Sequence, residues 1–527
     1  MIEEMDSIRL AKPKNKGLMS LIFSRFFVIV LLIIIELAVV VVSFVFLREK
    51  FPFIVVFLLL LTVAMLIYLF NSSMDSTAKL TWMLVISIFN IAGALFLLFT
   101  QTNLGHRIIR KKSNQMIQDT RNTIPQDPEV IKALRKEDHY TDDLVRYLNR
   151  SGCFPAFNDT ETTYFPLGED KFKAMLEELR KAEKYIFMEY FIIEEGYMWG
   201  QILNILIEKA KAGVDVRVMY DGMNEISTLP SDYCKLLEEQ GIKAKAFSPI
   251  VPLLSSHYNY RDHRKILVID GKTAFTGGVN LADEYINRIE RFGHWKDTAI
   301  MLKGRAALSF TLMFLQMWNI TEKVPDFKEA EEPPEPIVTG DGSKDKGFVV
   351  PYCDCPLDDD KVGETVYMDI LNRAGEYVHI MTPYLILDGE LEKALKYAGE
   401  RGIDVKIIIP GIPDKKVAYA LAKTHYKSLV RSGVKIYEYT PGFVHAKVAI
   451  SDNEKGVVGT INLDYRSLYH HFECATYMYK TPCIADMERD FQETLSKCRQ
   501  VTEETIKYET IFYKALGLVA KFFAPLM

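Results

Sequence analysis

The sequence contains one eight-residue pattern twice, as HRKILVID at 263–270 and as HAKVAISD at 445–452. We call this pattern the octet. Its shared residues are His263, Lys265 and Asp270 in the first copy, and His445, Lys447 and Asp452 in the second. A glycine and an asparagine follow each octet at matching positions, as Gly277 and Asn280, and as Gly459 and Asn462. This agreement predicts that the chain contains two related structural units.

Two further segments recur in the same order around the octets. The segment KAGVDVRVMYDG at 211–222 resembles ERGIDVKIIIPG at 400–411, and GIKAKAFSP at 241–249 resembles GVKIYEYTP at 433–441. Apolar strand-like runs alternate with helical stretches, which is typical of an α/β fold. We therefore predict two homologous domains, at 151–323 and 348–503, that pack with pseudo-twofold symmetry. A linker rich in proline, glycine and charge joins them at 324–347.

Three apolar runs precede the α/β region, at 26–47, 51–70 and 80–99. About 20 helical residues cross a hydrocarbon core of about 30 Å, so each run is long enough to cross a membrane. We predict a membrane anchor at 1–105 with two or three transmembrane helices, followed by a juxtamembrane linker at 106–150. Basic residues flank both sides of this anchor. The positive-inside rule places both flanks in the cytosol, which three membrane crossings do not allow. The sequence leaves open whether one run does not cross the membrane or the N-terminus faces outward.

The C-terminal segment at 504–527 has the pattern of an amphipathic helix. Lys507, Lys514 and Lys521 are spaced so that they share one helical face. Two interpretations stay open. The helix either docks on the rest of the protein or lies in a membrane interface.

The composition excludes some classes of partner and site. A net charge of -5 argues against a nucleic-acid partner, because such proteins usually have a basic excess. The seven cysteines are scattered and odd in number, so reduced thiols are expected and no disulfide framework. The CDC segment at 353–355 lacks a partner pair, so we expect no metal site. The thiols and the basic cluster at 107–112 place the globular part on the cytoplasmic side.

The spacing within the octet indicates which side chains can act together. Residues two apart on a strand point to the same face, so each histidine and its lysine share a face. Asp270 and Asp452 face away, and we interpret both as structural members of the candidate catalytic set. If the halves meet, the two histidines and two lysines converge with Asn280 and Asn462. The lysines and amides can bind a phosphate, while one imidazole attacks phosphorus and the other protonates the leaving alcohol.

Each imidazole also needs a carboxylate that fixes its tautomer. Downstream of the octets, Asp297 is the candidate partner of His263, and Glu473 is the candidate partner of His445. A carboxylate raises the pKa of a histidine, and Glu473 lies in the more apolar run, FECATYMY. We therefore predict that His445 is the general acid and base and that His263 is the nucleophile.

These residues resemble the phospholipase D superfamily, whose signature is a duplicated His-x-Lys-x4-Asp, and the wider segments look like bacterial cardiolipin synthases. The matching segments are RDHRKILVIDGKTAFTGGVNLADEYIN at 261–287, TPYL at 382–385 and FVHAKVAISD at 443–452. The resemblance implies the two-domain phospholipase D fold and a phosphohistidine intermediate. It implies condensation of two phosphatidylglycerols to cardiolipin and glycerol without a cofactor. It further implies membrane lipids as partners and a location in the bacterial cell membrane, and it is compatible with a homo-oligomer.

Two alternative functions follow from the same residues. A phospholipase D or a nuclease would use the same groups but pass the phosphoryl group to water. A non-catalytic membrane scaffold would have kept only the fold, although intact histidine, lysine and asparagine in both halves argue against it. Incubation with phosphatidylglycerol separates these alternatives by the lipid products.

Overall fold

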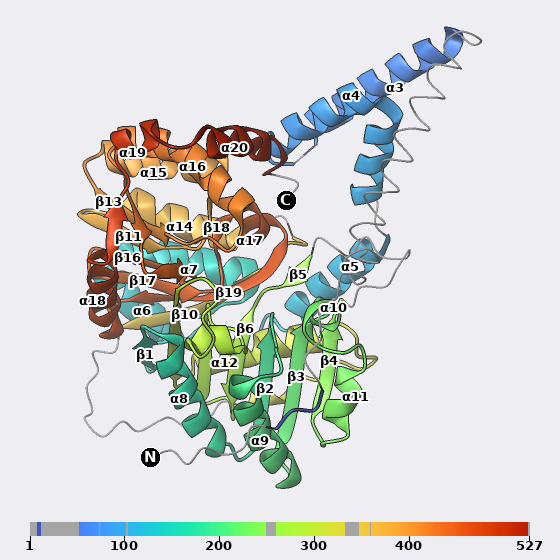
Figure 1. Cartoon of the computed structure of the whole chain (residues 1–527). Coiled ribbons are helices and arrows are strands. Elements are labelled where there is room, and N and C mark those ends of the chain that lie inside the picture. The colour runs from blue at the N-terminus through green and yellow to red at the C-terminus, as the bar shows by residue number, and fades with distance from the viewer. Residues whose placement is uncertain are drawn as a thin grey trace. The chain divides into compact units, whose positions relative to one another are not determined.

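The computed structural model describes residues 8–11, 52–72, 74–101, 104–248, 260–332, 347–358 and 360–524 (Figure 1). The chain divides into two compact units. One contains Met1–Pro13 and Ile108–Lys521, and we call it the catalytic unit because it holds both octets. The other contains Lys14–Arg107 and Phe522–Met527, and we call it the N-terminal unit.

The N-terminal unit contains helices α3 (Pro52–Phe70) and α4 (Ser76–Gln101). Asp75 stabilises the start of α4, where its Oδ1 accepts hydrogen bonds from the backbone N–H groups of Thr77 and Ala78. None of the helices in the described ranges is long and apolar enough to cross a membrane. The prediction of transmembrane helices is therefore not supported for the runs at 51–70 and 80–99, and the run at 26–47 lies outside the described residues.

The first half of the catalytic unit is built on a seven-stranded sheet with the order β1-β9-β7-β6-β2-β3-β4. Its strands are β1 (Glu161–Phe165), β2 (Tyr185–Tyr190), β3 (Asp215–Asp221), β4 (Lys243–Phe247), β6 (Lys265–Ile269), β7 (Thr273–Gly277) and β9 (Ala299–Lys303). Its main helices are α8 (Gly168–Arg180), α9 (Tyr197–Lys211), α11 (Tyr233–Glu238) and α12 (Ala307–Asn319). Strands β2, β3 and β4 are parallel, and the crossover segments between them contain α9 and α11.

The second half repeats this order as β10-β19-β17-β16-β11-β13-β14, with β20 added at the edge. Its strands are β10 (Phe348–Asp354), β11 (Tyr377–Met381), β13 (Asp404–Pro410), β14 (Lys435–Tyr439), β16 (Val448–Ser451), β17 (Lys455–Gly459), β19 (His471–Tyr479) and β20 (Cys498–Gln500). Its main helices are α14 (Val362–Arg373), α15 (Gly389–Glu400), α16 (Lys416–Arg431) and α18 (Cys483–Leu495). The predicted α/β fold with two homologous halves is confirmed.

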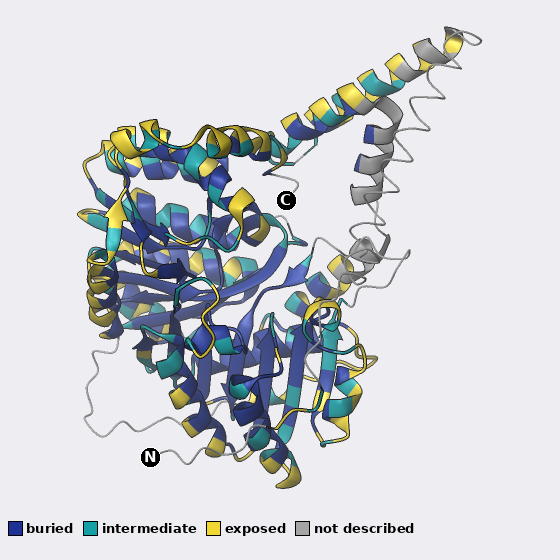
Figure 2. Ribbon diagram, viewed as in Figure 1, coloured by how far each residue is buried: buried dark blue, intermediate teal, exposed yellow. Residues whose placement is uncertain are grey.

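Two short strand pairings join the halves. Strand β5 (Arg261–Asp262), just before the first octet, pairs in parallel with the start of β19. Strand β15 (Gly442–Val444), just before the second octet, pairs in parallel with β8 (His294–Lys296) of the first half. Each octet therefore begins next to a strand of the opposite half. The strands around both octets are buried (Figure 2).

Helices α5 (Leu104–Asp119), α6 (Pro128–Glu137) and α7 (His139–Gly152) occupy the predicted juxtamembrane linker, with α6 and α7 packed on each other. Leu134, Leu144 and Leu148 belong to a large apolar core that also includes residues of both sheets. This segment is therefore part of the folded catalytic unit from Ile108 onward. Within the predicted interdomain linker, 333–346 lies outside the described residues.

The C-terminal segment forms α19 (Glu503–Lys507) and α20 (Ile511–Phe523). Helix α20 lies directly against α16, because a Cβ at Gly517 would come within 2.5 Å of the carbonyl oxygen of Ala420. Lys423 and Glu509 also form an ion pair. The opposite side of α20 exposes large apolar residues, including Ile511 at 84% and Leu518 at 70% exposure. The helix is thus docked on the protein and still presents an apolar surface to its surroundings.

Candidate active site

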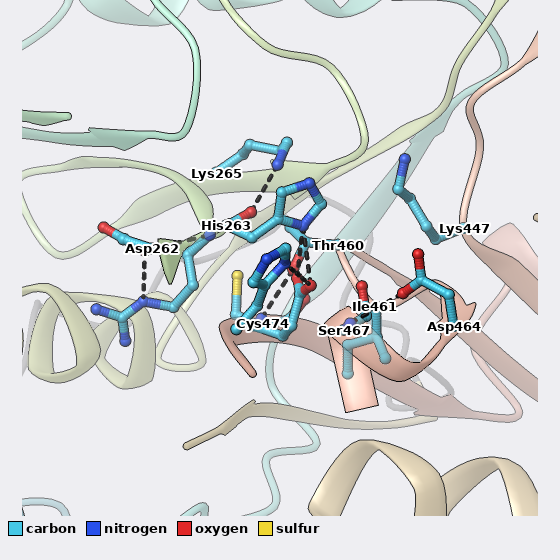
Figure 3. Close-up of polar contacts among 12 residues, drawn as sticks. Asp262, His263, Lys265, Lys447, Thr460, Ile461, Asp464, Ser467 and Cys474 are labelled. Carbon is cyan, nitrogen blue, oxygen red and sulfur yellow. Dashed lines mark hydrogen bonds and ion pairs between the residues drawn. The ribbon is translucent and has the colours of Figure 1, made fainter. Parts of the chain in front are cut away.

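Both octets have the same local structure. His263 and His445 lie just before strands β6 and β16, and both are buried. The Lys265 ammonium donates to the carbonyl oxygen of His263 at 2.6 Å, and Lys447 donates in the same way to the carbonyl oxygen of His445. Figure 3 shows His263, Lys265 and Lys447 together at the centre of this region. The predicted pairing of histidine with lysine is repeated in both halves.

The two octet aspartates stabilise backbone and do not face the imidazoles. Asp270 accepts hydrogen bonds from the N–H groups of Glu183, Lys184 and Tyr185 at 2.7–2.8 Å. Asp452 accepts three equivalent bonds at 2.9 Å from the N–H groups of 375–377. Burial acts to raise the pKa of Asp452, but these N–H groups lower it below its usual value. Both aspartates therefore hold backbone N–H groups, which supports the interpretation that they are structural.

The carboxylate partners are exchanged between the halves. His263 Nδ1 lies 2.9 Å from both carboxylate oxygens of Glu473, and His445 Nδ1 lies 2.7 Å from Asp297 Oδ2. The prediction that each carboxylate serves the histidine of its own half is therefore wrong. The cause is the pairing of strands between the two halves. Strand β5 places His263 beside β19, and β15 places His445 beside β8.

This exchange removes the argument that distinguished the two histidines. His445 was predicted as the general acid because of Glu473, but Glu473 lies next to His263. In both halves the carboxylate accepts a hydrogen bond from Nδ1, because a carboxylate can only accept. The Nε2 lone pair of each neutral imidazole is then available for chemistry.

Burial strongly affects the charges of the site. It lowers the pKa of His263 well below its usual value and that of His445 to about 4, so both imidazoles are neutral at rest near pH 7. Burial also lowers the pKa of Lys265 to about 8 and that of Lys447 to about 7. The charge on Lys265 of the first half also lowers the pKa of both His445 and Lys447 of the second half.

The two predicted phosphate-binding asparagines differ in their contacts. Asn280 Oδ1 accepts from the N–H of Ile192 at 3.0 Å, and its Nδ2 donates to the Tyr285 hydroxyl at 2.8 Å. Asn462 is also buried, but its Oδ1 has no hydrogen-bond partner among the described residues. Asn280 is therefore held by the first half, whereas Asn462 has an amide oxygen left for a ligand.

Three residues beside the carboxylates, Thr460, Gly278 and His471, were missed by the sequence analysis. The Thr460 hydroxyl donates to Glu473 Oε2, and the equivalent position in the first half is Gly278. A Cβ at Gly278 would lie 2.0 Å from Asp297 Oδ1, so only glycine leaves room for that carboxylate. His471 lies two residues before Glu473, with its ring 5.2 Å from the ring of His263. The doublet GT at 459–460 against GG at 277–278 was the available sequence signal for this difference.

One group of buried side chains could hold a metal ion, although the sequence analysis expected no metal site. His263, His471 and Glu473 each offer one ligand atom, and these atoms lie within 4.8 Å of one another. All three residues are buried. The expectation rested on cysteine spacing, and this group is assembled from separate segments that no local spacing reveals.

Two homologous sheets with a duplicated His–Lys pair and carboxylate-oriented imidazoles define a phospholipase D-type site for phosphodiester chemistry. A family model described as cardiolipin synthase, phospholipase D-like domain, matches residues 175–318 and 367–495, which is more than half of the chain. The chain therefore belongs to this family and is an enzyme of the cardiolipin synthase type.

Individual proteins are also similar to this chain. An uncharacterized protein of Streptococcus mutans is 58% identical over 88% of this chain and 99% of its own length. A cardiolipin synthase of Alkalihalophilus pseudofirmus is 32% identical over 88% of this chain and 91% of its own length. The crystal structure of a phosphatidylserine synthase from Haemophilus influenzae covers 73% of this chain and 97% of its own, with a TM-score of 0.55 and 16% identity. That last likeness concerns the fold alone.

Proposed function

We propose that this enzyme condenses two phosphatidylglycerol molecules to cardiolipin and glycerol through a phosphatidyl–histidine intermediate. The observation that supports this most strongly is the exchanged pairing, in which each imidazole is fixed at Nδ1 by a carboxylate of the other half. This arrangement leaves two Nε2 atoms and two buried lysines for one phosphodiester. Catalytic histidines oriented by carboxylates are a recurring means of covalent catalysis.

In the first step, His263 Nε2 attacks the phosphorus of one phosphatidylglycerol. A P–N bond forms while the bond from phosphorus to the glycerol head group breaks. His445 gives a proton to the leaving glycerol oxygen. Because burial lowers the pKa of His445 in the free enzyme, we propose that the bound phosphate anion raises it and so protonates this imidazole. The family resemblance is the support for naming His263 as the nucleophile.

In the second step, His445 takes the proton from a terminal hydroxyl of the second phosphatidylglycerol. That oxygen attacks phosphorus, the P–N bond breaks, and cardiolipin leaves with the His263 imidazole restored. Glu473 and Asp297 stabilise the positive charge that each imidazole acquires during the cycle. No cofactor takes part in this sequence.

Lys265, Lys447 and Asn462 are proposed to bind the phosphate. The two ammonium groups offset its negative charge as oxygen charge develops in the transition state. The Asn462 amide adds neutral contacts to the phosphate or the head group. Asn280 is proposed to contribute through its remaining N–H and by positioning Tyr285, whose ring lies 5.5 Å from the ring of His445.

We propose that the catalytic unit works on lipids at the cytoplasmic face of the bacterial membrane. Helix α20 supports this, because Ile511, Phe512, Leu518 and Val519 expose apolar surface that a lipid interface would cover. Lys507, Lys514 and Lys521 are exposed along the same segment and would attract anionic lipid. Replacing Ile511 and Phe512 by aspartate should weaken binding to phosphatidylglycerol vesicles in a sedimentation assay, whereas Lys235→Glu, an exposed change elsewhere, should not.

The side of the membrane is tested by labelling an introduced cysteine at the exposed position Lys235 with an impermeant thiol reagent. Protection in intact cells and labelling after lysis are the expected results. Rapid labelling in intact cells would place the catalytic unit outside.

The activity is tested by incubating the purified protein with phosphatidylglycerol and resolving lipids and released glycerol. We expect cardiolipin and glycerol in equal amounts, and neither with His263→Ala. Phosphatidic acid as the main product would make the enzyme a hydrolase that uses water in the second step. The absence of turnover by a folded protein would support the scaffold alternative.

A further inference from the structure

His471 is a buried imidazole that the proposed reaction does not use. It begins strand β19 and is only 7% exposed. Neither of its ring nitrogens has a hydrogen-bond partner within the described ranges. Buried polar groups are nearly always satisfied, so such a group calls for a ligand, an ion or a water.

The surroundings of His471 contain two further ligands of suitable chemistry. Its Nδ1 lies 3.6 Å from Glu473 Oε1, and His263 Nδ1 lies 2.9 Å from the same oxygen. Zinc binds nitrogen and oxygen ligands at about 2.0–2.2 Å with tetrahedral geometry, which places neighbouring ligand atoms about 3.3 Å apart. The two observed distances lie on either side of that value, so small side-chain movements would complete the geometry.

We propose that His263, His471 and Glu473 form a binding site for one divalent transition-metal ion of the zinc class, and that its occupancy stops turnover. Two imidazoles and one carboxylate are a ligand set that such ions favour, with a fourth position left for water. Magnesium and calcium prefer oxygen ligands and should bind here poorly.

The inhibition follows from the tautomer of His263. In the metal-free site the ring proton lies on Nδ1, toward Glu473, and the lone pair lies on Nε2. A metal bound at Nδ1 displaces that proton, and a neutral coordinated imidazole then has its proton on Nε2. The Nε2 atom loses its lone pair and cannot attack phosphorus. This part of the inference rests on the proposed function, whereas metal binding itself does not.

The first half lacks the equivalent site. Trp295 lies two residues before Asp297, as His471 lies before Glu473, and its ring is 5.5 Å from the ring of His445. An indole offers no lone pair to a metal. One ion per chain is therefore expected at the active site. A second group that contains a histidine, His139 with Asp142 and Asp143, is more exposed and serves as a control.

The experiment is a titration of the purified full-length chain with Co²⁺, a zinc substitute with visible d–d absorption, under metal-free buffer conditions. We expect saturation at one tightly bound ion in the native enzyme. His471→Asn should weaken binding at least about tenfold, because it removes a ligand. His139→Asn should leave the tight site unchanged, and His471→Cys, which keeps a metal-binding donor, should retain binding.

Zn²⁺ inhibition is then measured against the metal-free activity of each variant, with EDTA to reverse it. The native enzyme should be inhibited and restored, and His471→Asn should resist. Failure of the native enzyme to bind Co²⁺, or equal effects of His471→Asn and His139→Asn, would overturn the proposal. If His471→Asn does not fold, His471→Gln provides the same test. Co²⁺ binding without turnover of phosphatidylglycerol would keep the metal site and reject the proposed function.

Discussion

The two halves of the catalytic unit share their backbone framework and differ around their imidazoles. Both sheets have the same strand order, and in both the octet aspartate accepts three N–H groups at the start of the strand next to the octet strand. Each octet lysine donates to the carbonyl oxygen of its histidine. These repeated contacts fix where the histidine lies, and they do so with main-chain partners.

The differences lie in the residues that surround each histidine. His263 is accompanied by Glu473, Thr460 and His471, whereas His445 is accompanied by Asp297, Gly278 and Trp295. The former set has a longer carboxylate with a hydroxyl donor and a second imidazole. The latter has a shorter carboxylate that occupies the space left by a missing Cβ. The two halves therefore share one backbone framework and place different side chains around their histidines.

The largest expected effect comes from removing either histidine. His263→Ala and His445→Ala should each lower kcat by about 10⁴-fold or more, and the double variant should be no worse than either, because residues that act as a unit are not additive. The measurement is the rate of cardiolipin formation by the folded single and double variants. Substantial activity in either single variant would mean that the halves form two independent sites.

The exchanged pairing is tested by replacing the carboxylates. Glu473→Gln and Asp297→Asn should each lower kcat/KM by about 10²–10⁴-fold. The reason is that an amide can hold the neighbouring imidazole in the tautomer that has its proton on Nε2. In double-mutant cycles, we expect strong coupling of His263 with Glu473 and of His445 with Asp297. Stronger coupling of His445 with Glu473 than with Asp297 would restore pairing within one half and reject the observed exchange.

The octet aspartates should show the reverse behaviour. Asp270→Asn and Asp452→Asn replace a charged acceptor of three backbone N–H groups by a weaker, neutral one. Each should therefore lower the free energy of unfolding by about 1–3 kcal/mol. Activity per folded molecule should stay near that of the native enzyme, in contrast to a loss of about 10²–10³-fold in Lys265→Ala. Urea unfolding and rates measured on the same preparations separate the two effects. A stable but inactive Asp270→Asn enzyme would contradict the structural role.

The smallest effect concerns the pH dependence of stability. The folded pKa of His445 is about 4, below its unfolded value of about 6.5. The unfolded state therefore binds more protons in this window, and stability is lost as pH falls from about 6.5 toward 4. His445→Gln should reduce the slope by up to about 1.4 kcal/mol per pH unit. Urea unfolding of the native enzyme and of His445→Gln between pH 4 and 7.5 measures how the free energy of unfolding changes with pH. An equal slope in both proteins would mean that His445 is charged in the folded state.

The sequence predicted those features that depend on local spacing. Strand alternation placed histidine and lysine together and turned Asp270 and Asp452 away from them. Glu473 and Asp297 were identified as histidine partners because each imidazole needs a carboxylate that fixes its tautomer. Matching segments in the same order predicted the duplicated α/β fold.

The sequence did not predict features that depend on contacts between the halves. The pairings of β5 with β19 and of β15 with β8 involve only two and three residues, which leave no periodic signal. They nevertheless decide which carboxylate meets which histidine. The closeness of His471 to His263 has the same origin, because it depends on β5 lying beside β19.

The claim that two homologous halves form one site with unequal roles is tested most directly by trapping the intermediate. The purified enzyme is mixed with phosphatidylglycerol labelled in the phosphate, quenched at high pH, where phosphohistidine survives, and digested for peptide mapping. We expect label on the peptide with His263 and none on the peptide with His445. Label on His445, or on both histidines, would contradict it.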